Sequence, residues 1–260
     1  MKNNNQNYNY TRIDLKKKLI RLGLKKNDLV FIHSNLAFFG KIKSKENPCK
    51  IFLNEILKII GKNGTLVVPT FTYSMNAIYD VKKTPSVCGV FSEYVRKSKQ
   101  GIRSLDPIFS IYSIGKYSKY LTNISSIDGH QCFGKNSFFE KFYKLNGKII
   151  NFNETCASTH IHYFEKKLKV NYRKDKKFLI KLKIQKLYKT KKIIFYCVKN
   201  LKKIEARFDK FHNFAIEEKL AKEIKLGLGI ITYMKIKNME KVVYKNAGRK
   251  NFLYKMLKNF

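Results

Sequence analysis

The sequence lacks any long hydrophobic run: no apolar stretch approaches the roughly 18 residues that a membrane-spanning helix requires. Its first residues, MKNNNQNYNYTR, also lack the apolar stretch of a secretory signal. We therefore expect a soluble protein of the cytoplasm.

The chain has no C-x-x-C pair, although it contains five cysteines. An odd number of cysteines in a chain without a secretory signal favours reduced thiols. The spacing shows no zinc-binding motif, so we expect no metal. A free cysteine is usually a small buried hydrophobe, and we interpret all five in this way: Cys49, Cys88, Cys132, Cys156 and Cys197.

Acidic residues are scarce, since 18 Asp and Glu stand against 55 Lys and Arg and the formal net charge is +37. Such a charge is typical of proteins that bind nucleic acid or anionic membranes. Arginine, the better residue for bidentate contacts with bases and phosphates, is a small minority, and the lysines are spread along the whole chain. We favour a solvated basic surface, and a non-enzymatic nucleic-acid-binding protein stays open as an alternative.

Hydrophobic residues make up 44% of the chain, including 20 Phe and 16 Tyr, which is ample for a folded core. The 260 residues exceed what one small core needs but fall short of two average domains. Neither an internal repeat nor a Pro/Ser-rich linker divides them. We predict a single α/β domain over residues 1–260, with a motif-bearing core at 10–170 and a hairpin-and-helix portion at 171–260.

Hydrophobic periodicity predicts an alternation of strands and helices. An apolar strand at 29–32 is followed by a helix at 51–60 that Gly61 ends, and by a second apolar strand at 64–68. This order indicates a parallel sheet, so the predicted class is α/β, a mostly parallel sheet flanked by helices with an appended β-rich C-terminal portion. Further predictions are helices within 13–24 (ended by Gly23) and at 90–95, 137–145, 208–225 and 251–257, strands at 108–114, 148–152, 229–234 and 241–244, and a hairpin of 178–187 with 193–198.

One segment combines three chemically useful side chains at helical spacing. Thr159, His162 and Glu165 share one face if a helix begins at Thr159, and the segment follows the strand at 148–152, where open α/β sheets bind ligands. A histidine there suits general-base work near neutral pH, and the glutamate can orient its ring. The alternative is a helix-capping threonine with an ordinary surface His–Glu pair. His160 is expected to pack on the other side.

Polar side chains also follow the other two apolar strands. His33 and Ser34 come directly after the strand at 29–32, and Thr70 and Thr72 follow the strand at 64–68. Hydrogen-bonding groups in these places suit a ligand that carries phosphates or amides, and they equally suit turns and helix caps.

Six short motifs occur in order between residues 10 and 170. They are DLVFIHSNL at 28–36 with Gly40; GTLVVPTFT at 64–72; TPS at 84–86 with Gly89; RSLDP at 103–107 with Ser110 and Gly115; Phe133-Gly134 with Ser137; and Thr159-x-x-His162-x-x-Glu165. Together they resemble the aminoglycoside 3-N-acetyltransferase family, the antibiotic N-acetyltransferases that use acetyl-CoA.

The resemblance implies direct transfer of an acetyl group from acetyl-CoA to an amino group on a sugar-like ring, without a covalent enzyme intermediate. His162 takes the place of the family's catalytic histidine and Glu165 that of its helix carboxylate, while Thr159 is the first candidate for a hydroxyl that faces the oxyanion. The family's coenzyme-binding segments carry over to six residues: His33, Ser34, Thr70, Thr72, Ser104 and Ser110.

Two departures from the family bear on the acceptor. Drug-modifying members usually carry His where this chain has Asp106, and a glycine-rich stretch where it has GKIKS at 40–44. The RSLDP form resembles members linked to surface-polysaccharide biosynthesis. The positive charge favours an anionic acceptor, such as a nucleotide-linked amino sugar, over a polycationic aminoglycoside. The substrate-binding carboxylates are then expected at Asp106 and at Glu205 or Asp209.

Two alternatives with the same fold stay open. One is an aminoglycoside-inactivating 3-N-acetyltransferase. The other is a member that binds coenzyme A without catalysis, because residues 40–44 lack the run of glycines that lets a backbone approach phosphates closely.

Overall fold

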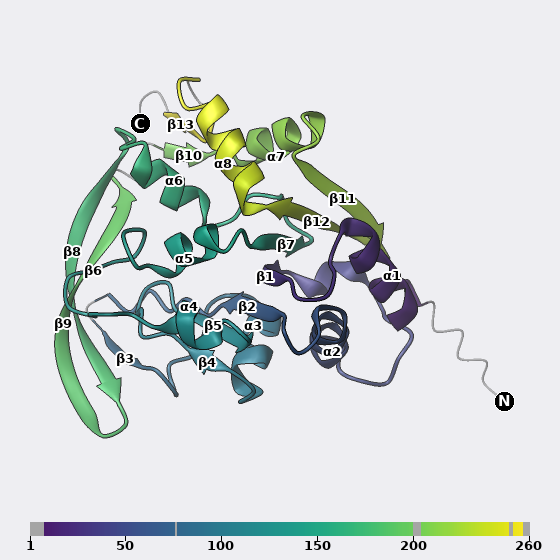
Figure 1. The fold of residues 1–260 in the computed structure, drawn as a ribbon, viewed down its shortest axis with the longest axis horizontal. Coiled ribbons are helices and arrows are strands. Elements are labelled where there is room, and N and C mark those ends of the chain that lie inside the picture. Colours follow the sequence, from purple (N-terminus) through teal and green to yellow (C-terminus); the bar gives the residue numbers. More distant parts are fainter. Residues whose placement is uncertain (1–7, 76, 200–203, 250–251, 257–260) are drawn as a thin grey trace.

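A seven-stranded sheet runs through the centre of the molecule in the computed structural model, which describes residues 8–75, 77–199, 204–249 and 252–256 (Figure 1). Its order is β11-β12-β7-β1-β2-β5-β4. β7, β1 and β2 pair in parallel and the outer strands join antiparallel, so that five of the seven strands share one direction. The predicted α/β class is confirmed. The strands are β1 (Leu29–Ser34), β2 (Thr65–Pro69), β4 (Ile102–Arg103), β5 (Ile111–Gly115), β7 (Lys148–Phe152), β11 (Ala221–Leu226) and β12 (Gly229–Lys235).

Alternate residues of the central strands enter two hydrophobic cores, one on each face of the sheet. Phe31 and Val67 belong to one core, whereas Val30 and Leu66 belong to the other, as the two-residue repeat of a strand requires. Helices α1 to α3 cover one face and α4 to α8 the other. The helices are α1 (Arg12–Leu22), α2 (Pro48–Ile60), α3 (Gly89–Lys97), α4 (Ser118–Thr122), α5 (Phe138–Lys144), α6 (Ile161–Lys167), α7 (Phe208–Glu217) and α8 (Ile236–Lys245), with a 3₁₀ turn, η1 (Leu36–Phe39).

Two predicted helix ends are confirmed. α1 begins at a capping box made by Thr11 and Asp14 and ends at Gly23, whose φ of 114° lies in the left-handed region that glycine tolerates. α2 begins after Asn47, whose side chain accepts a hydrogen bond from the amide of Cys49, and it ends at Gly61.

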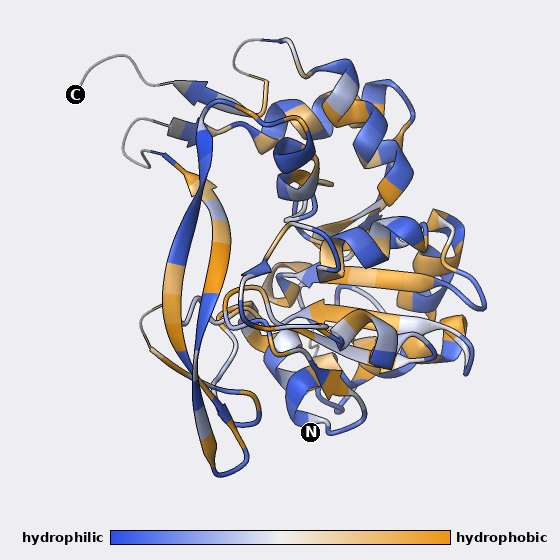
Figure 2. Cartoon of the chain, turned by 60° about the vertical axis from the view of Figure 1, so that its left-hand side comes forward, coloured by the Kyte–Doolittle hydropathy of each residue, from blue (hydrophilic) through white to orange (hydrophobic). Residues whose placement is uncertain are grey.

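A long hairpin packs along one side of the body (Figure 2). Its strands are the middle pair of a four-stranded sheet with the order β3-β8-β9-β6. The predicted hairpin is confirmed, but the turn lies at Gln185 and Lys186, so Leu187 begins the second strand instead of ending the first. The strands are β3 (Ile78–Asp80), β6 (His130–Gln131), β8 (Arg173–Ile184) and β9 (Leu187–Val198).

Three C-terminal predictions are wrong. α7 ends at Glu217, and the end of the helix predicted at 208–225 is β11. The strand predicted at 241–244 belongs to α8, because Ile236, Met239 and Val243 recur at the spacing of a buried helix face. In place of a terminal helix, β13 (Tyr254–Met256) pairs with β10 (Ile204–Ala206). Both ends of that predicted helix, 251 and 257, lie outside the described residues.

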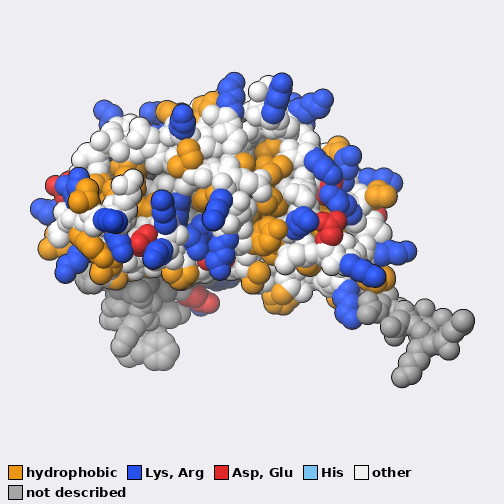
Figure 3. Space-filling view, turned by 90° about the horizontal axis from the view of Figure 1, so that it is seen from below, with side chains coloured by type: hydrophobic (Ala, Val, Ile, Leu, Met, Phe, Trp, Pro, Cys, Tyr) orange, Lys and Arg blue, Asp and Glu red, His pale blue; other side chains and the backbone are white. Residues whose placement is uncertain are grey.

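Lys and Arg side chains are scattered over the face of the molecule shown in Figure 3, with few acidic side chains between them. This distribution favours the interpretation of the charge as a solvated surface. None of the helices in the described ranges is long and apolar enough to cross a membrane.

Candidate active site

The carboxyl ends of the three parallel strands meet at one edge of the central sheet. Ser34 at the end of β1 pairs in register with Phe152 at the end of β7, and β2 lies on the other side of β1. The loop after β7 is tied down by the buried side chain of Asn151, which donates hydrogen bonds to the carbonyl oxygens of Thr155 and Ala157 at 2.5 and 2.8 Å. This loop leads directly into α6, so it fixes where Thr159 and His162 lie.

A cleft of about 790 Å³ opens at this edge. Its wall is formed by the end of β1, the first residues of α2 and α3, and the loop after β7, with Tyr73, Glu154 and Thr159 among the lining residues. None of the described residues that line it is Lys or Arg. Desolvation raises the pKa of the Glu154 carboxyl above its usual value. The cleft therefore differs sharply in charge from the rest of the molecule.

His33 and Ser34 lie in the wall of the cleft, as the sequence predicted for a ligand-binding edge. The Nε2 atom of His33 and the Oγ atom of Ser34 are buried and have no hydrogen-bond partner in the described structure. Burial lowers the pKa of His33 to about 4, so its imidazole is neutral at pH 7. A buried polar atom without a partner is costly, and no described group uses the hydrogen-bonding capacity of these two atoms.

His162 and Glu165 form a close pair on α6. Nδ1 of His162 lies 2.7 Å from Oε2 of Glu165. The glutamate is completely buried, whereas 17% of the histidine side chain is exposed. Tyr172 donates its hydroxyl hydrogen to Oε1 of Glu165 at 2.7 Å, and Nε of Arg173 lies 2.8 Å from Oε2. The predicted face of α6 thus carries a histidine oriented by a carboxylate.

The charges around this pair favour a neutral ring beside a charged carboxylate. Burial lowers the pKa of His162, the Arg173 cation lowers it further, and Glu165 opposes both. For Glu165, burial raises the pKa, but His162, Arg173 and Tyr172 outweigh it and hold the pKa below its usual value. If Nδ1–H donates to Glu165, the lone pair of Nε2 is left to accept a proton.

Thr159 lines the cleft three residues before His162, which is itself not among the lining residues, and it lies before the helix instead of beginning it as expected. α6 begins at Ile161, and its N-cap is His160 without a side-chain cap. The alternative of Thr159 as a helix-capping residue is therefore wrong. His160 is completely buried among phenylalanine rings, with Phe142 at 4.5 Å between ring centroids. The prediction that His160 packs is confirmed.

The structure does not bring Thr70, Ser104 and Ser110 to the cleft, although the resemblance assigned them to the coenzyme. All three are buried, and their hydroxyls are used inside the protein. Ser110 donates to the Thr70 carbonyl oxygen, and Ser104 accepts from the amide of Ile111. The position of a residue after a strand correctly predicts that it lies at the cleft edge of the sheet, but it does not predict whether its side chain faces the cleft. Thr72 is half-buried and donates to the Pro107 carbonyl oxygen at 2.6 Å.

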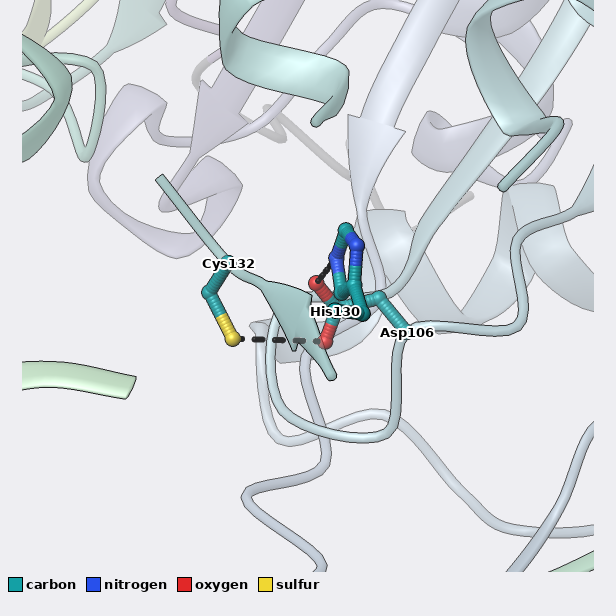
Figure 4. Close-up of side chains that lie close together, drawn as sticks. All are labelled: Asp106, His130 and Cys132. Atoms are coloured by element: carbon teal, nitrogen blue, oxygen red, sulfur yellow. Dashed lines mark hydrogen bonds and ion pairs between the residues drawn. The ribbon is translucent and has the colours of Figure 1, made fainter. Parts of the chain in front are cut away.

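Asp106, predicted to bind substrate, lies instead in a buried cluster with His130 and Cys132 (Figure 4). Its Oδ1 atom accepts hydrogen bonds from two backbone amides, and its Oδ2 atom lies 3.1 Å from Nε2 of His130. The Cys132 thiol is 3.9 Å from Oδ1. These bonds occupy both carboxylate oxygens and tie Asp106 to the loop before β5.

Glu205 and Asp209 are also absent from the cleft wall. Asp209 is 57% exposed and pairs with Arg207 at 2.8 Å, and Glu205 is an exposed residue of β10. The carboxylate that does line the cleft is Glu154. Its position in the loop between β7 and Thr159 is the signal in the sequence, and helical spacing does not detect it.

The partners of Glu165 were missed as well. Arg173 begins β8 and Tyr172 directly precedes it, and Tyr254, on β13, accepts a hydrogen bond from Arg173 at 2.6 Å. The sequence carried one usable signal, since arginine is rare in this chain and Arg173 follows the His162 motif closely. Nothing in the sequence indicated that Tyr254 returns to the same place.

Comparisons with known proteins agree with this architecture. A family model described as aminoglycoside 3-N-acetyltransferase matches residues 31–245. No protein of curated function matches the sequence.

Several solved structures share the fold at low sequence identity. A binary complex of AAC-IIIb with CoASH has a TM-score of 0.78 and 16% identity, covering 91% of this chain and 96% of that chain. AAC-VIa bound to sisomicin has a TM-score of 0.78 and 14% identity, covering 92% and 97%. The YokD protein from Bacillus subtilis has a TM-score of 0.74 and 18% identity, covering 92% and 93%. Because the family model spans most of the chain, the protein belongs to the aminoglycoside 3-N-acetyltransferase family and is an N-acetyltransferase.

Proposed function

We propose that this enzyme transfers an acetyl group from acetyl-CoA to an amino group of an amino sugar, with His162 as the general base. The observation that carries the proposal is the contact between Nδ1 of His162 and the buried Glu165 carboxylate at 2.7 Å, three residues after the cleft-lining Thr159. Family membership favours an enzyme over the non-enzymatic nucleic-acid-binding alternative. A structural neighbour in complex with CoASH supports acetyl-CoA as the donor.

In the proposed reaction, Nε2 of His162 takes a proton from the acceptor's ammonium or attacking amine. The amine nitrogen forms a bond to the thioester carbonyl carbon, and the carbon–sulfur bond then breaks. The coenzyme leaves as a thiolate that takes up a proton. Glu165 keeps Nδ1 of the ring protonated, so that Nε2 faces the acceptor. The Thr159 hydroxyl is our candidate donor to the oxyanion of the tetrahedral intermediate.

We place the coenzyme in the 790 Å³ cleft. Because the lining residues include no Lys or Arg, the phosphates have to be held by other donors. The N-terminus of α3 flanks the cleft without a side-chain cap and presents backbone N–H groups with the positive end of the helix dipole. The N-terminus of α2 also flanks the cleft, but Pro48 has no N–H and the amide of Cys49 is bonded to Asn47, so α2 contributes mainly its dipole. The unpartnered atoms of His33 and Ser34 supply side-chain hydrogen bonds. Thr70, Ser104 and Ser110 have no place in this site.

For the acceptor we favour an anionic, nucleotide-linked amino sugar used in surface-polysaccharide biosynthesis. The basic side chains spread over the surface in Figure 3 attract anions at long range. An aminoglycoside is the second candidate, because a neighbour of the same fold is bound to sisomicin and because Glu154 places a carboxylate in the cleft. We take residues 1–260 as one domain in either case.

The test measures release of free coenzyme A with a thiol reagent, using acetyl-CoA and three groups of acceptors: nucleotide-linked amino sugars, free amino sugars and aminoglycosides. We expect the highest kcat/KM with a nucleotide-linked acceptor. A higher kcat/KM with gentamicin-type aminoglycosides than with nucleotide-linked amino sugars refutes the proposed anionic acceptor, while the proposed acetyl transfer still holds. No release with any amine overturns the proposed function.

A matched pair of variants tests the role of His162. His162→Gln should lower kcat by about 10²–10⁴-fold, which is the usual contribution of a general base. Coenzyme affinity should stay within about twofold. The control is Ser126→Ala, which changes an exposed residue distant in sequence from the His162–Glu165 pair. The kcat of this variant should match that of the wild-type enzyme.

A further inference from the structure

Arg173 lies against both members of the His162–Glu165 pair. It is the first residue of β8 and only 6% exposed. Its Nε atom is 2.8 Å from Oε2 of Glu165, and its Nη2 atom is 3.0 Å from Nδ1 and 3.5 Å from Nε2 of His162. The guanidinium donates hydrogen bonds to the carbonyl oxygen of Tyr196 at 3.1 Å and to the hydroxyl of Tyr254 at 2.6 Å, whereas its Nε contact with Glu165 is an ion pair without hydrogen-bond geometry. When Nδ1–H of His162 donates to Glu165, Nη2 acts on the ring through its charge and not as a donor. The cation on β8 is thus held by groups from three other elements, α6, β9 and β13.

We infer that Arg173 is a positioning residue for the proposed base: its guanidinium holds the Glu165 carboxylate against His162 and sets a positive charge beside the imidazole. The inference rests on the proposed function, because it explains how that base is kept ready to accept a proton. It assigns no contact between Arg173 and the substrate.

The physical need for such a cation follows from the buried carboxylate. A histidine bonded only to a buried, charged glutamate is stabilised in its protonated form, and an imidazolium cannot act as a base. Arg173 neutralises the carboxylate and repels a proton on the ring. Burial contributes in the same direction, so the pKa of His162 falls below its usual value even though Glu165 raises it. Glu165 then orients the ring of His162, and the ring stays neutral.

The groups that face the pair come from every element packed around it. Glu165 belongs to α6, Arg173 to β8 and Tyr254 to β13, while Tyr172 precedes β8. From β9, the hydroxyl of Tyr196 reaches the backbone oxygen of Glu165. Among these groups in the described structure, Arg173 and Glu165 carry the charges that act on His162. Burial and the charge of Glu165 raise the pKa of both Tyr172 and Tyr254 above the usual tyrosine value, so the phenols stay neutral near pH 7.

Lysine would not reproduce this arrangement in full. A guanidinium is planar and presents several N–H donors at once, which lets it contact the carboxylate, the ring and the tyrosine hydroxyl together. The ammonium group of lysine supplies the positive charge but not the planar set of N–H donors. Comparing Arg173→Gln with Arg173→Lys therefore separates the effect of the charge from the effect of the shape.

The direct test is an NMR titration of the His162 ring in the unliganded protein, with His162→Gln used to assign its signal among the five histidines. We expect wild-type His162 to titrate below pH 6.5. In Arg173→Gln the midpoint should rise by roughly one to two pH units, which is the usual effect of losing a close charge, and in Arg173→Lys it should stay within about half a unit. The acid limb of kcat/KM should move in parallel.

The matched control is Arg96→Gln, which removes another largely buried arginine paired with a glutamate, Glu93 at 2.5 Å. It should leave the titration of His162 unchanged. A His162 midpoint above pH 6.5 in the wild-type protein overturns the inference, even if Arg173→Gln does not fold. An unchanged midpoint in a folded Arg173→Gln protein also overturns it. Because the titration needs no turnover, it separates failure of this inference from failure of the proposed function.

Discussion

Acid should destabilise the protein through His33, and the size of the effect follows from the burial of this side chain. Burial lowers the pKa of His33 to about 4, whereas a histidine in an unfolded chain titrates near 6.5. The unfolded chain therefore binds the proton first, so the stability associated with neutral His33 is complete above pH 6.5 and is lost as the pH falls toward 4. At about 1.36 kcal/mol per pH unit, the loss is about 2 kcal/mol at pH 5 and about 3 kcal/mol at pH 4.

The assay is urea unfolding of the wild-type protein and of His33→Gln at pH 7, 6 and 5, with the free energy of unfolding extrapolated to water. Other groups also titrate in this range, so the informative quantity is the difference between the two proteins. The free energy of unfolding of His33→Gln should fall by about 2 kcal/mol less than that of the wild-type protein between pH 7 and pH 5. Ser34→Ala changes the same cleft wall without removing a titratable group, and it should follow the wild-type pH dependence. If His33→Gln and the wild-type protein differ by less than about 0.5 kcal/mol across this range, the reasoning from burial is refuted.

Three further predictions concern other parts of the molecule. Glu165→Ala should lower the free energy of unfolding by about 3–5 kcal/mol, because it leaves the Arg173 cation buried without its partner. Glu218→Ala, which breaks an exposed pair with Lys245, should change the free energy of unfolding by less than about 0.5 kcal/mol. Thermal unfolding of both variants and the wild-type protein measures the difference. Gly115→Ala should be destabilising in urea unfolding, because a Cβ atom there would meet a backbone oxygen at 2.1 Å and because its φ of +121° disfavours side chains; stability equal to that of the wild-type protein would contradict this reading. Acetyl-CoA at about 100 times its dissociation constant should stabilise the wild-type protein and His162→Gln equally, by about 2.7 kcal/mol, and a shift in calorimetry for only one of them would mean that His162 takes part in coenzyme binding.

The part of the fold that could be predicted from the sequence is the part in which local pattern and burial agree. β1, β2 and β7 are apolar runs because helices cover both faces of the sheet, and such runs are visible without any knowledge of the neighbours. The elements that were predicted wrongly include a short apolar run that is compatible with both a strand and a helix. The run at 241–244 is compatible with a strand by itself, and only its helical spacing from Ile236 and Met239 identifies it as α8.

The candidate site shows the same limit in a different form. His162 and Glu165 lie on one helix, so their spacing placed them together correctly. Thr70 and Ser110 lie next to the ends of β2 and β5, yet the sequence does not record that the Thr70 hydroxyl bonds to Ser110 and the Ser110 hydroxyl to the Thr70 backbone. Tyr254 reaches Arg173 over 81 residues of sequence, a contact that only the folded chain creates.

Net charge was the least useful guide to the site, for a reason that applies beyond this protein. A charge of +37 is a sum over 260 residues, and on the face shown in Figure 3 the Lys and Arg side chains stand in solvent. A binding site depends on the few residues that line it, and here these include Glu154 but no lysine or arginine. Surface charge acts at long range and governs how fast an anion approaches, whereas affinity depends on the groups that contact it after desolvation. An enzyme of this composition can therefore attract an anionic ligand with its surface and still hold its phosphates with backbone N–H groups.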